Sequence, residues 1–592
     1  MNKKLSIFFL ASLFLFASAC NEDFLDKKPL AGFPEDDVWN DPTLTEAFLN
    51  DIYRGLGHGM YETMLASHTD ETHFIHNYDT RQVVESILTP TDLGNFNGGR
   101  LPHFQWNDSY KRIRAANIFL EKIDETPFEE DLKKRMKGEA HFLRAYFYHN
   151  LVRLFGGVPI VTKVYELGDD FLVERNTLKE CIDFIAVECE AAASLLPLRQ
   201  EGANVGRANK GAAMALKARM LLYAASDLYH TTGWTSGFGN PELVGYVGAD
   251  RNQLWRDAKD AAKAIIDLGA YDLYNRTPNS QEDAIQGYTD LFLSKQNEEV
   301  IFNRFFLEKR DDGYNFGKHN GPNGYHNWGG NTPLQNLIDD YEMEDGSLFD
   351  WDDPAHAAAP YKNRDPRFYA SILYDGAKWR PRPSDVIDMD SEGIIQTGQY
   401  ERKNSSGEIE VMEGLDTRKS PIEDWNGSYS GYYLRKFVDV NVDHQFFKQE
   451  TPWPFFRYGE ILLNYAEASI ELGEEDDARM AINMIRERAG MPTISDTGAD
   501  LKQRYRNERR VEMAFEEQRY FDARRWMIAP DVLSKDAQGI QIYAKLNGDN
   551  THTYTYTPIV VQDRGWNDRM YLLPIPQGEM EKNNKLIQNP GY

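Results

Sequence analysis

Cysteine is scarce in this chain of 592 residues, which contains only three. Cys181 and Cys189 are eight positions apart in a segment with helical periodicity. Their Cα atoms would therefore lie about 12 Å apart at a rise of ~1.5 Å per residue. Because that separation exceeds the reach of a disulfide, we expect the fold to be held by its hydrophobic core without a bridge between these cysteines.

Long apolar runs and an excess of basic residues are also missing. After the first residues, no stretch reaches the ~20 apolar residues that a membrane-spanning helix needs. The chain has 66 Lys and Arg against 93 Asp and Glu, which gives a formal net charge of −27. An acidic surface of this kind argues against nucleic acid and anionic lipid as partners.

Recognisable catalytic motifs are absent from the sequence. It contains no Gly-x-Ser-x-Gly, His-Glu-x-x-His, Walker loop or Gly-x-Gly-x-x-Gly, and the segment GLGHGM at residues 55–60 falls one residue short of the last of these. Pairs of carboxylates are uninformative in a chain with 93 acidic residues. The sequence therefore predicts a protein that is not an enzyme.

The N-terminus has the architecture of an export signal. Lys3 and Lys4 precede an apolar run at residues 5–16, and small residues lead to Cys20. Cleavage before Cys20 would free a cysteine for lipidation, whereas an ordinary secretory peptide would be cut at a nearby Ala-x-Ala. We favour the lipidated cysteine because the signal and the cysteine coincide at the correct position, and stable anchoring needs two or more lipid chains.

Helical periodicity recurs in pairs of segments along the chain. The third pair approaches the length of a tetratricopeptide unit, in which helix pairs stack to bury their apolar faces. A plain helical bundle is the alternative, and both give a mainly α fold. The predicted helices cover residues 132–155 with 177–196, 210–229 with 255–268, and 457–472 with 476–489, and a fourth pair begins in residues 504–527.

The amino-acid composition changes between the second and third helix pairs. Residues 275–451 are rich in Gly, Asn, Pro and aromatic residues, most densely at residues 311–333. Loops of this length are uncommon unless they are functional. Near the C-terminus, residues 556–580 first resemble a strand and then become irregular. We therefore expect a helical scaffold with a loop-rich region inserted into it.

Five segments carry a resemblance to a known family. They are CNEDFLDKKP at residues 20–29, GEAHFLRAYFYHNLVRLFGGVPIV at 138–161, RYGEILLNYAEA at 457–468, RNERRVEMAFEEQRYFDARRW at 506–526, and the ending LLPIPQGEMEKNNKLIQNPGY at 572–592. In this order they resemble the SusD/RagB family of nutrient-binding outer-membrane lipoproteins over nearly the whole chain. Glu517 and Ala523 depart from the pattern, where members usually have glycine and leucine.

The resemblance implies tetratricopeptide-like helix pairs forming an α-helical scaffold, with a loop-rich ligand-binding region. It divides the chain into a lipoprotein signal peptide at residues 1–19 and one SusD-like domain at 20–592. That domain has an N-terminal part at 20–274, a loop-rich insert at 275–452 and a C-terminal part at 453–592. The arginine and histidine residues of the family motifs are expected to be structural, since buried charges are usually paired.

The implied role is non-catalytic capture of oligosaccharide or polysaccharide at the cell surface. The captured glycan would pass to a SusC-like TonB-dependent transporter for import. The expected location is the outer membrane, anchored through Cys20 and facing the exterior. Capture of a peptide or glycopeptide with the same transporter is the nearest alternative, and a surface glycoside hydrolase, which needs two carboxylates ~5–10 Å apart, is an alternative of another class.

Two segments offer the chemistry that a sugar binder needs. Sugar rings pack their CH faces on flat aromatic side chains while polar groups bond the hydroxyls. The alternative for each aromatic residue is a buried loop anchor, and Trp106 is expected in the core. The candidate ligand-binding residues are Asp70, Tyr78, Arg81, Asn95 and Phe96 in the first segment, and Tyr325, Asn327 and Trp328 in the second.

No cofactor or metal site is expected from the sequence. His68, His73 and His76, with Asp79 beyond, are interpreted as exposed loop histidines near the ligand segment rather than as zinc ligands. Residues 439–450 carry oxygen-bearing side chains at positions that a calcium-binding loop uses. Its sixth position, however, is His444 instead of the glycine that such a loop requires. We expect a strand there, and a structural calcium ion remains possible but unlocated on this acidic protein.

Overall fold

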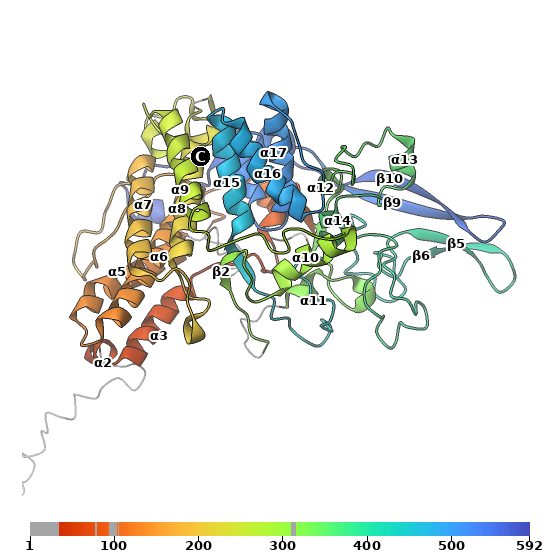
Figure 1. Cartoon of the computed structure of the whole chain (residues 1–592), viewed down its shortest axis with the longest axis horizontal. Helices are drawn as coiled ribbons and strands as arrows, with labels where there is room; N and C mark the ends of the chain where they lie inside the picture. Colours follow the sequence, from red (N-terminus) through yellow and green to blue (C-terminus); the bar gives the residue numbers. More distant parts are fainter. Residues whose placement is uncertain are drawn as a thin grey trace, which may run out of the picture.

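The computed structural model describes residues 35–592, apart from residues 77, 79, 94–103, 105, 232 and 309–314. The predicted signal peptide and Cys20 lie outside the described residues. Helices dominate what is described, so the prediction of a mainly α fold is confirmed. Figure 1 shows the long helices on the left and in the middle of the molecule, while loops, short helices such as α13 and a narrow sheet extend to the right.

A row of helices forms the body. Each helix packs on the next from α5 to α9, and α9 then packs on α15 across a gap of nearly two hundred residues in the sequence. This adjacency agrees with stacked helix pairs, while the finer tetratricopeptide likeness stays a prediction. The helices are α5 (Trp106–Lys122), α6 (Glu130–Phe155), α7 (Leu178–Leu195), α8 (Lys210–Ala225), α9 (Arg251–Ile266) and α15 (Tyr458–Glu471).

Local signals in the sequence set several helix ends. Helix α6 stops at Gly156, whose φ of 78° lies in the left-handed region that glycine adopts without strain. Helix α7 begins with a capping box, in which the side chains of Thr177 and Glu180 each bond the backbone of the other. Trp106, at the start of α5, is buried in the core, as predicted. The predicted helices of the first three pairs are therefore confirmed to within a few residues.

The fourth predicted helix pair corresponds to two helices. Residues 504–527 are divided between α17 (Gly498–Glu512) and α18 (Arg519–Arg525). Between these helices, Phe515 and Glu517 have φ values of 65° and 62°, which interrupt the helix. Glu517 thus occupies a left-handed position where the family pattern has glycine, and this geometry explains the preference for that residue.

Further short helices frame the body and the loops. At the N-terminal end, α2 (Glu35–Asn40) and α3 (Pro42–Tyr53) pack on each other. The remaining helices are α4 (Arg81–Val84), α10 (Gln281–Leu293), α11 (Phe316–Asn320), α12 (Gln335–Ile338), α13 (Pro354–Ala358), α14 (Pro366–Ser371), α16 (Glu475–Arg488), α19 (Ala529–Val532) and α20 (Gln577–Lys582).

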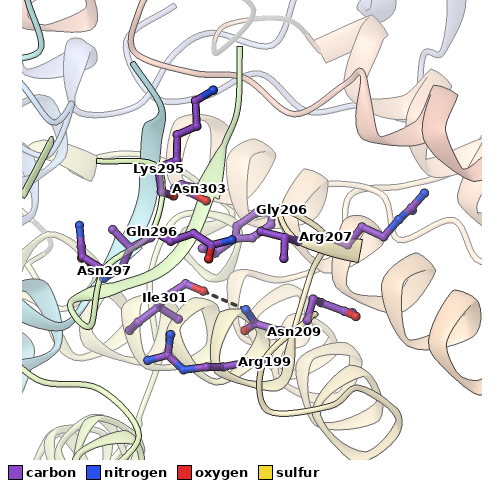
Figure 2. A pocket seen from close by; sticks show the side chains of 13 residues that line it. Arg199, Gly206, Arg207, Asn209, Lys295, Gln296, Asn297, Ile301 and Asn303 are labelled. Carbon is purple, nitrogen blue, oxygen red and sulfur yellow. Dashed lines mark hydrogen bonds between the residues drawn. The ribbon is translucent and has the colours of Figure 1, made fainter. Parts of the chain in front are cut away.

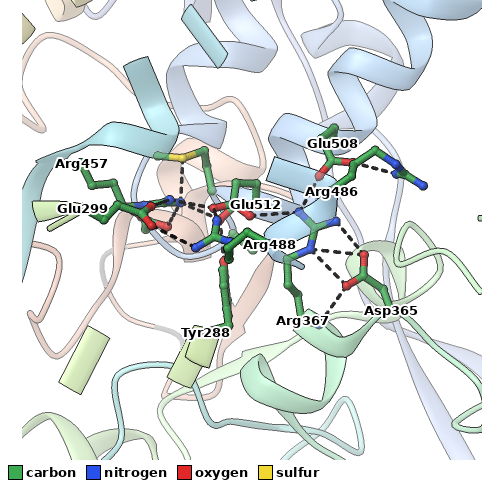
Figure 3. A network of polar contacts seen from close by, with 12 residues as sticks. Tyr288, Glu299, Asp365, Arg367, Arg457, Arg486, Arg488, Glu508 and Glu512 are labelled. Carbon is green, nitrogen blue, oxygen red and sulfur yellow. Dashed lines mark hydrogen bonds and ion pairs between the residues drawn. The ribbon is translucent and has the colours of Figure 1, made fainter. Parts of the chain in front are cut away.

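A buried network of charges joins the loop-rich region to the C-terminal helices (Figure 3). Arg457 contacts Glu299 at 2.8 Å and Glu512 at 2.7 Å. Glu512 also accepts from Arg367 at 3.0 Å and from Arg488. Burial by itself raises the pKa of Glu512, but the surrounding guanidinium groups outweigh burial and hold the pKa below its usual range. The network therefore needs every member to be charged.

Arginines of the family motifs are paired in the same way. In α6, Arg144 donates to both carboxylate oxygens of Glu188, at 2.7 and 2.8 Å. In α18, Arg525 bonds Glu467 at 2.6 and 2.7 Å. His149 is fully buried. The prediction that these motif residues are structural agrees with their burial and pairing.

The strands form small sheets outside the helical row. One has four strands in the order β10-β9-β5-β6, and β9 pairs antiparallel with β10 but parallel with β5. Figure 1 shows it as an extended wing. The other pairs are β1 with β3, β2 with β8 and β4 with β7. The strands are β1 (Thr72–Phe74), β2 (Val300–Arg304), β3 (Asn331–Pro333), β4 (Ile372–Leu373), β5 (Gln399–Lys403), β6 (Ile409–Glu413), β7 (Tyr433–Leu434), β8 (Trp453–Arg457), β9 (Ala537–Leu546) and β10 (His552–Gln562).

The strand predicted at residues 439–450 is wrong. These residues form turns, and β8 begins only at Trp453. His444 is buried, and its Nε2 lies 3.0 Å from the carbonyl oxygen of Asp439, which closes the turn locally. The strand-like start of residues 556–580 is confirmed by β10, which is followed by irregular backbone.

Candidate ligand-binding groove

A groove opens where three loop segments meet. Its volume is about 610 Å³, within the ~300–1,000 Å³ typical of small-molecule sites. One wall follows β1, a second comes from the loop before β3, and a third comes from residues 418–429. The lining residues are Glu62, Ile75, His76, Tyr78, Trp328, Arg418, Trp425, Asn426 and Tyr429.

Trp328 offers a flat apolar face in this groove. Its ring lies parallel to the ring of His319, with centroids 4.8 Å apart and an interplanar angle of 10°. The Lys318 ammonium lies 5.4 Å from the indole centroid. The Trp328 side chain remains 37% exposed. Because His319 supports the ring and more than a third of the residue stays exposed, the indole is positioned to receive a sugar ring.

Glycines allow the loop that carries Trp328 to approach its neighbours. Gly329 has a φ of 53°, and a Cβ there would lie 2.4 Å from the carbonyl oxygen of Asn426. A Cβ on Gly330 would lie 2.6 Å from the carbonyl oxygen of His319. Backbone bonds then close the loop, such as the 2.8 Å bond from the Trp328 amide to the Lys318 carbonyl. The glycine-rich sequence therefore fixes the platform in place.

The wall after β1 contributes polar groups beside a second ring. Tyr78 donates its hydroxyl to Glu62, and its ring stacks on that of His76 with centroids 6.1 Å apart. Burial, chiefly, and the positive charge of Arg418 lower the pKa of His76, although Glu62 opposes the shift. His76 is therefore neutral near pH 7. This wall presents one carboxylate, one imidazole and one phenol to the groove.

The third wall carries the arginine of the groove. The Arg418 guanidinium lies 4.0 Å from the ring centroid of Tyr429. Its Nη1 donates to the carbonyl oxygens of Trp425 at 3.0 Å and Gly427 at 3.1 Å. Trp425 is 70% exposed and Tyr429 is 42% exposed. These contacts hold the guanidinium beside two exposed aromatic residues, a combination that suits a ring rimmed by hydroxyls.

Two predicted ligand residues are buried away from the groove. Asp70 is paired with Arg510 at 2.6 Å and Arg519 at 2.9 Å. Burial by itself raises the pKa of Asp70, but these two arginines outweigh burial and lower it. Tyr325 is 3% exposed, packs under Arg382 and donates its hydroxyl to the Arg380 carbonyl at 2.8 Å. Both side chains are anchors within the protein.

The other predicted residues are distributed differently. Tyr78 and Trp328 line the groove together. Asn327 is buried at 5% exposure beside Trp328 and does not line it. Arg81 points to solvent and pairs with Glu85 at 2.9 Å. Asn95 and Phe96 lie outside the described residues, so their predicted role stays a prediction.

The sequence reasoning missed the wall formed by Arg418, Trp425 and Tyr429. These residues follow Trp328 by about one hundred positions, and only the fold brings them beside it. A signal was present, because the segment DWNGSYSG at residues 424–431 has the same mixture of aromatic, Asn and Gly residues as the loop before β3.

The histidines proposed as exposed loop residues are mostly buried, which corrects that interpretation. His68 and His73 are 2% and 5% exposed, and only His76 lines the groove. Asp79 lies outside the described residues. Among the described residues, no group of three or more His, Cys, Asp or Glu side chains is placed to hold a metal ion.

A second hollow lies between residues 199–209 and the segment that contains β2 (Figure 2). Its volume is about 130 Å³, below the range typical of ligand sites. Asn209 closes its floor by donating to the Ile301 carbonyl at 2.9 Å. Its polar side chains include Arg207, which is already paired with Glu139. The groove at Trp328 is therefore the better candidate.

Comparison with known proteins agrees with the fold. The model of the SusD family matches residues 298–592, and a second model, described as starch-binding associating with outer membrane, matches residues 23–222. A SusD-like protein of Formosa agariphila is 30% identical over 500 residues, which cover 82% of this chain and 80% of the relative. The chain belongs to the SusD family.

Solved structures show the same architecture. A SusD-like protein from Bacteroides fragilis superposes with a TM-score of 0.73 at 29% identity, covering 96% of this chain and all of that one. A second protein from the same species, described as a SusD-like carbohydrate-binding protein, has a TM-score of 0.70 at 25% identity and covers 93% of this chain and all of that one. No helix in the described part of the chain is long and apolar enough to cross a membrane.

Proposed function

We propose that this protein captures oligosaccharide or polysaccharide at the cell surface, without cleaving it, and delivers it to a SusC-like TonB-dependent transporter for import. The observation that carries the proposal is the half-open Trp328 indole, supported by His319 and facing a groove with Tyr78, Tyr429 and Trp425. Membership of the SusD family and likeness to a carbohydrate-binding structure support it.

Each group of the groove has a defined part in this proposal. A sugar ring packs its CH face on Trp328, and the adjacent rings exclude water from the remaining apolar edges. Arg418 and Asn426 donate hydrogen bonds to hydroxyl oxygens, while the Glu62 carboxylate accepts from a hydroxyl. Because these contacts surround the sugar ring and its hydroxyls, they orient the bound sugar without cleaving it.

Location and delivery are further parts of the proposal. Lipid on Cys20 would hold the protein at the outer membrane with the groove facing outward, where a large glycan is accessible. The description of the matched family model as associating with the outer membrane supports this location. Replacing Cys20 with alanine should release the protein from the outer membrane, and a Cys20→Ala variant that still fractionates there would contradict the lipid anchor.

The test is binding to soluble polysaccharides by affinity electrophoresis and calorimetry. We expect at least one glycan to bind and Trp328→Ala to weaken it by at least about tenfold, roughly 1.4 kcal/mol. The control is Phe171→Ala, which removes a ring that is 63% exposed on a loop of the helical body. Binding of peptides alone would favour the peptide alternative, and release of sugar by the pure protein would favour a glycoside hydrolase.

A further inference from the structure

The groove at Trp328 does not end at its third wall. A second pocket, distinct from the hollow in Figure 2, has a volume of about 340 Å³. It shares Arg418 and Tyr429 with the groove. The two hollows therefore meet at these two side chains, which we call the Arg418–Tyr429 ridge. Each hollow is within the size range of a small-molecule site.

The second pocket has the character of a saccharide subsite. Residues of β5, β9 and β10 build it together with residues 413–431. Ile542 and Ile559 give it an apolar side. Gln399, Thr417 and Gln541 supply amides and a hydroxyl, and Gln399 is held by a 2.7 Å bond to Glu413. An apolar side with a few placed polar groups suits a ring rimmed by hydroxyls.

Contacts with neighbouring groups fix the two side chains of the Arg418–Tyr429 ridge. The ring of His73, from β1, meets the Tyr429 ring edge-on with centroids 5.6 Å apart. Arg418 also packs on the Tyr429 ring at 4.0 Å, and its Nη1 is fixed by two backbone carbonyls. Tyr429 is therefore held by two groups from different segments and can support a glycan that passes over it.

Arg418 retains N–H groups that can donate hydrogen bonds to a bound glycan. Its hydrogen bonds go to the carbonyl oxygens of Trp425 and Gly427, and no carboxylate among the described residues pairs with it. The remaining N–H groups therefore lie between the two hollows without a protein partner in that part of the chain. A guanidinium with unpaired N–H groups can donate to two oxygens of one glycan where the glycan passes over Arg418.

We propose that a glycan chain runs from the Trp328 groove over the Arg418–Tyr429 ridge into the second pocket, so that the protein recognises an extended internal stretch of polysaccharide. This inference rests on the proposed function and specifies its ligand as a chain longer than the Trp328 groove can hold. Short oligosaccharides fill the groove alone, whereas longer ones gain the ridge and the second pocket.

The experiment is calorimetry against a panel of soluble polysaccharides that includes starch and laminarin, each as intact polymer and as size-fractionated hydrolysate. We expect affinity to rise by about tenfold or more with chain length and then to level off. Ile559→Trp, which places an indole in the second pocket, should reduce the affinity for long chains to that for short ones. Short-chain affinity should stay unchanged.

Val560→Trp is the matched control, because neighbouring residues of β10 point to opposite faces and Val560 is 56% exposed outside the pocket. Thermal unfolding of both variants verifies that they fold. Equal affinity for short and long chains, or long-chain binding unaffected by Ile559→Trp, would overturn the second subsite even if Trp328→Ala weakens binding. Absence of binding at every length would overturn both the subsite and the proposed function.

Discussion

Arginine plays opposite roles in two regions of this molecule. At the end of β8 and in α16, Arg457 and Arg488 are almost fully buried, and they contact three and two carboxylates respectively (Figure 3). In the groove, Arg418 is partly exposed, and within the described residues it is held by backbone carbonyls and the Tyr429 ring without a carboxylate. The first arrangement satisfies the charge within the protein, and the second leaves donors for a ligand.

The comparison separates stability from recognition. A buried guanidinium that has lost its carboxylate is strongly destabilising, because its desolvation is no longer offset. A half-exposed guanidinium loses little when it is replaced, since water solvates what remains. We therefore expect changes in the buried network to alter unfolding and changes in the groove to alter binding.

The largest effect is expected from Glu512→Gln. This change leaves Arg457, Arg488 and Arg367 without their shared carboxylate. The free energy of unfolding should fall by about 3–5 kcal/mol, measured by urea denaturation. The control is Asp183→Asn, which breaks an exposed pair with Lys179 and should cost well under ~1 kcal/mol. Equal effects of the two changes would contradict the distinction drawn between the regions.

Arg418→Met should have the next largest effect, on binding instead of stability. Loss of the charged donors should weaken glycan binding by about ten- to one-hundredfold, because hydrogen bonds to charged groups contribute ~1.5–3 kcal/mol. The unfolding midpoint should change little. Calorimetry beside the exposed-arginine variant Arg402→Met provides the comparison. A variant that binds normally but unfolds readily would show that Arg418 is structural.

His73 should make the ridge sensitive to acid. Burial, chiefly, with Arg564 and Arg418, lowers the pKa of His73 from 6.5 to about 3. The folded state therefore favours neutral His73, and its contribution to stability is complete above pH 6.5 and is lost as the pH falls from 6.5 towards 3. Between pH 7 and 5.5, the wild type should lose about 1 kcal/mol more than His73→Phe. If the wild type and His73→Phe have identical pH profiles of the free energy of unfolding, the lowered pKa of His73 is contradicted.

Arg81→Ala should have the smallest effect. The side chain is 64% exposed, and its pair with Glu85 spans one helical turn. Stability should change by less than ~0.5 kcal/mol, and glycan affinity should remain within about twofold. A larger loss of affinity would return Arg81 to the ligand site and show that a long glycan reaches beyond the groove wall.

Much of the fold was predictable because helix signals are local. Gly156 directly follows the end of α6, and the capping pair Thr177 and Glu180 lies at the start of α7, so each helix end is set by residues beside it in the sequence. The errors occur where a tertiary contact overrides the local pattern. The predicted strand at 439–450 becomes a turn because His444 packs inward, and His68 and His73, which were interpreted as exposed, are buried.

The groove was predictable only in part. Trp328 and Tyr78 could be proposed because loop aromatics with polar neighbours suit sugar, but Tyr325 has the same local context and is buried. Local composition cannot tell which ring faces out, because Tyr325 is covered by Arg382 and bonded to the Arg380 carbonyl, both from another loop. The wall at residues 418–429 required long-range proximity.

By itself, the sequence determined the helical body and the family, because periodicity, caps and ordered motifs act over short distances. It also supplied the aromatic and glycine-rich loops from which a site could be built. Only the tertiary structure decided that Trp328, Tyr78 and Arg418 share a groove, that Asp70 is locked between two arginines, and that the groove continues past Tyr429. The physical reason is that burial and pairing are properties of side chains brought together from distant segments.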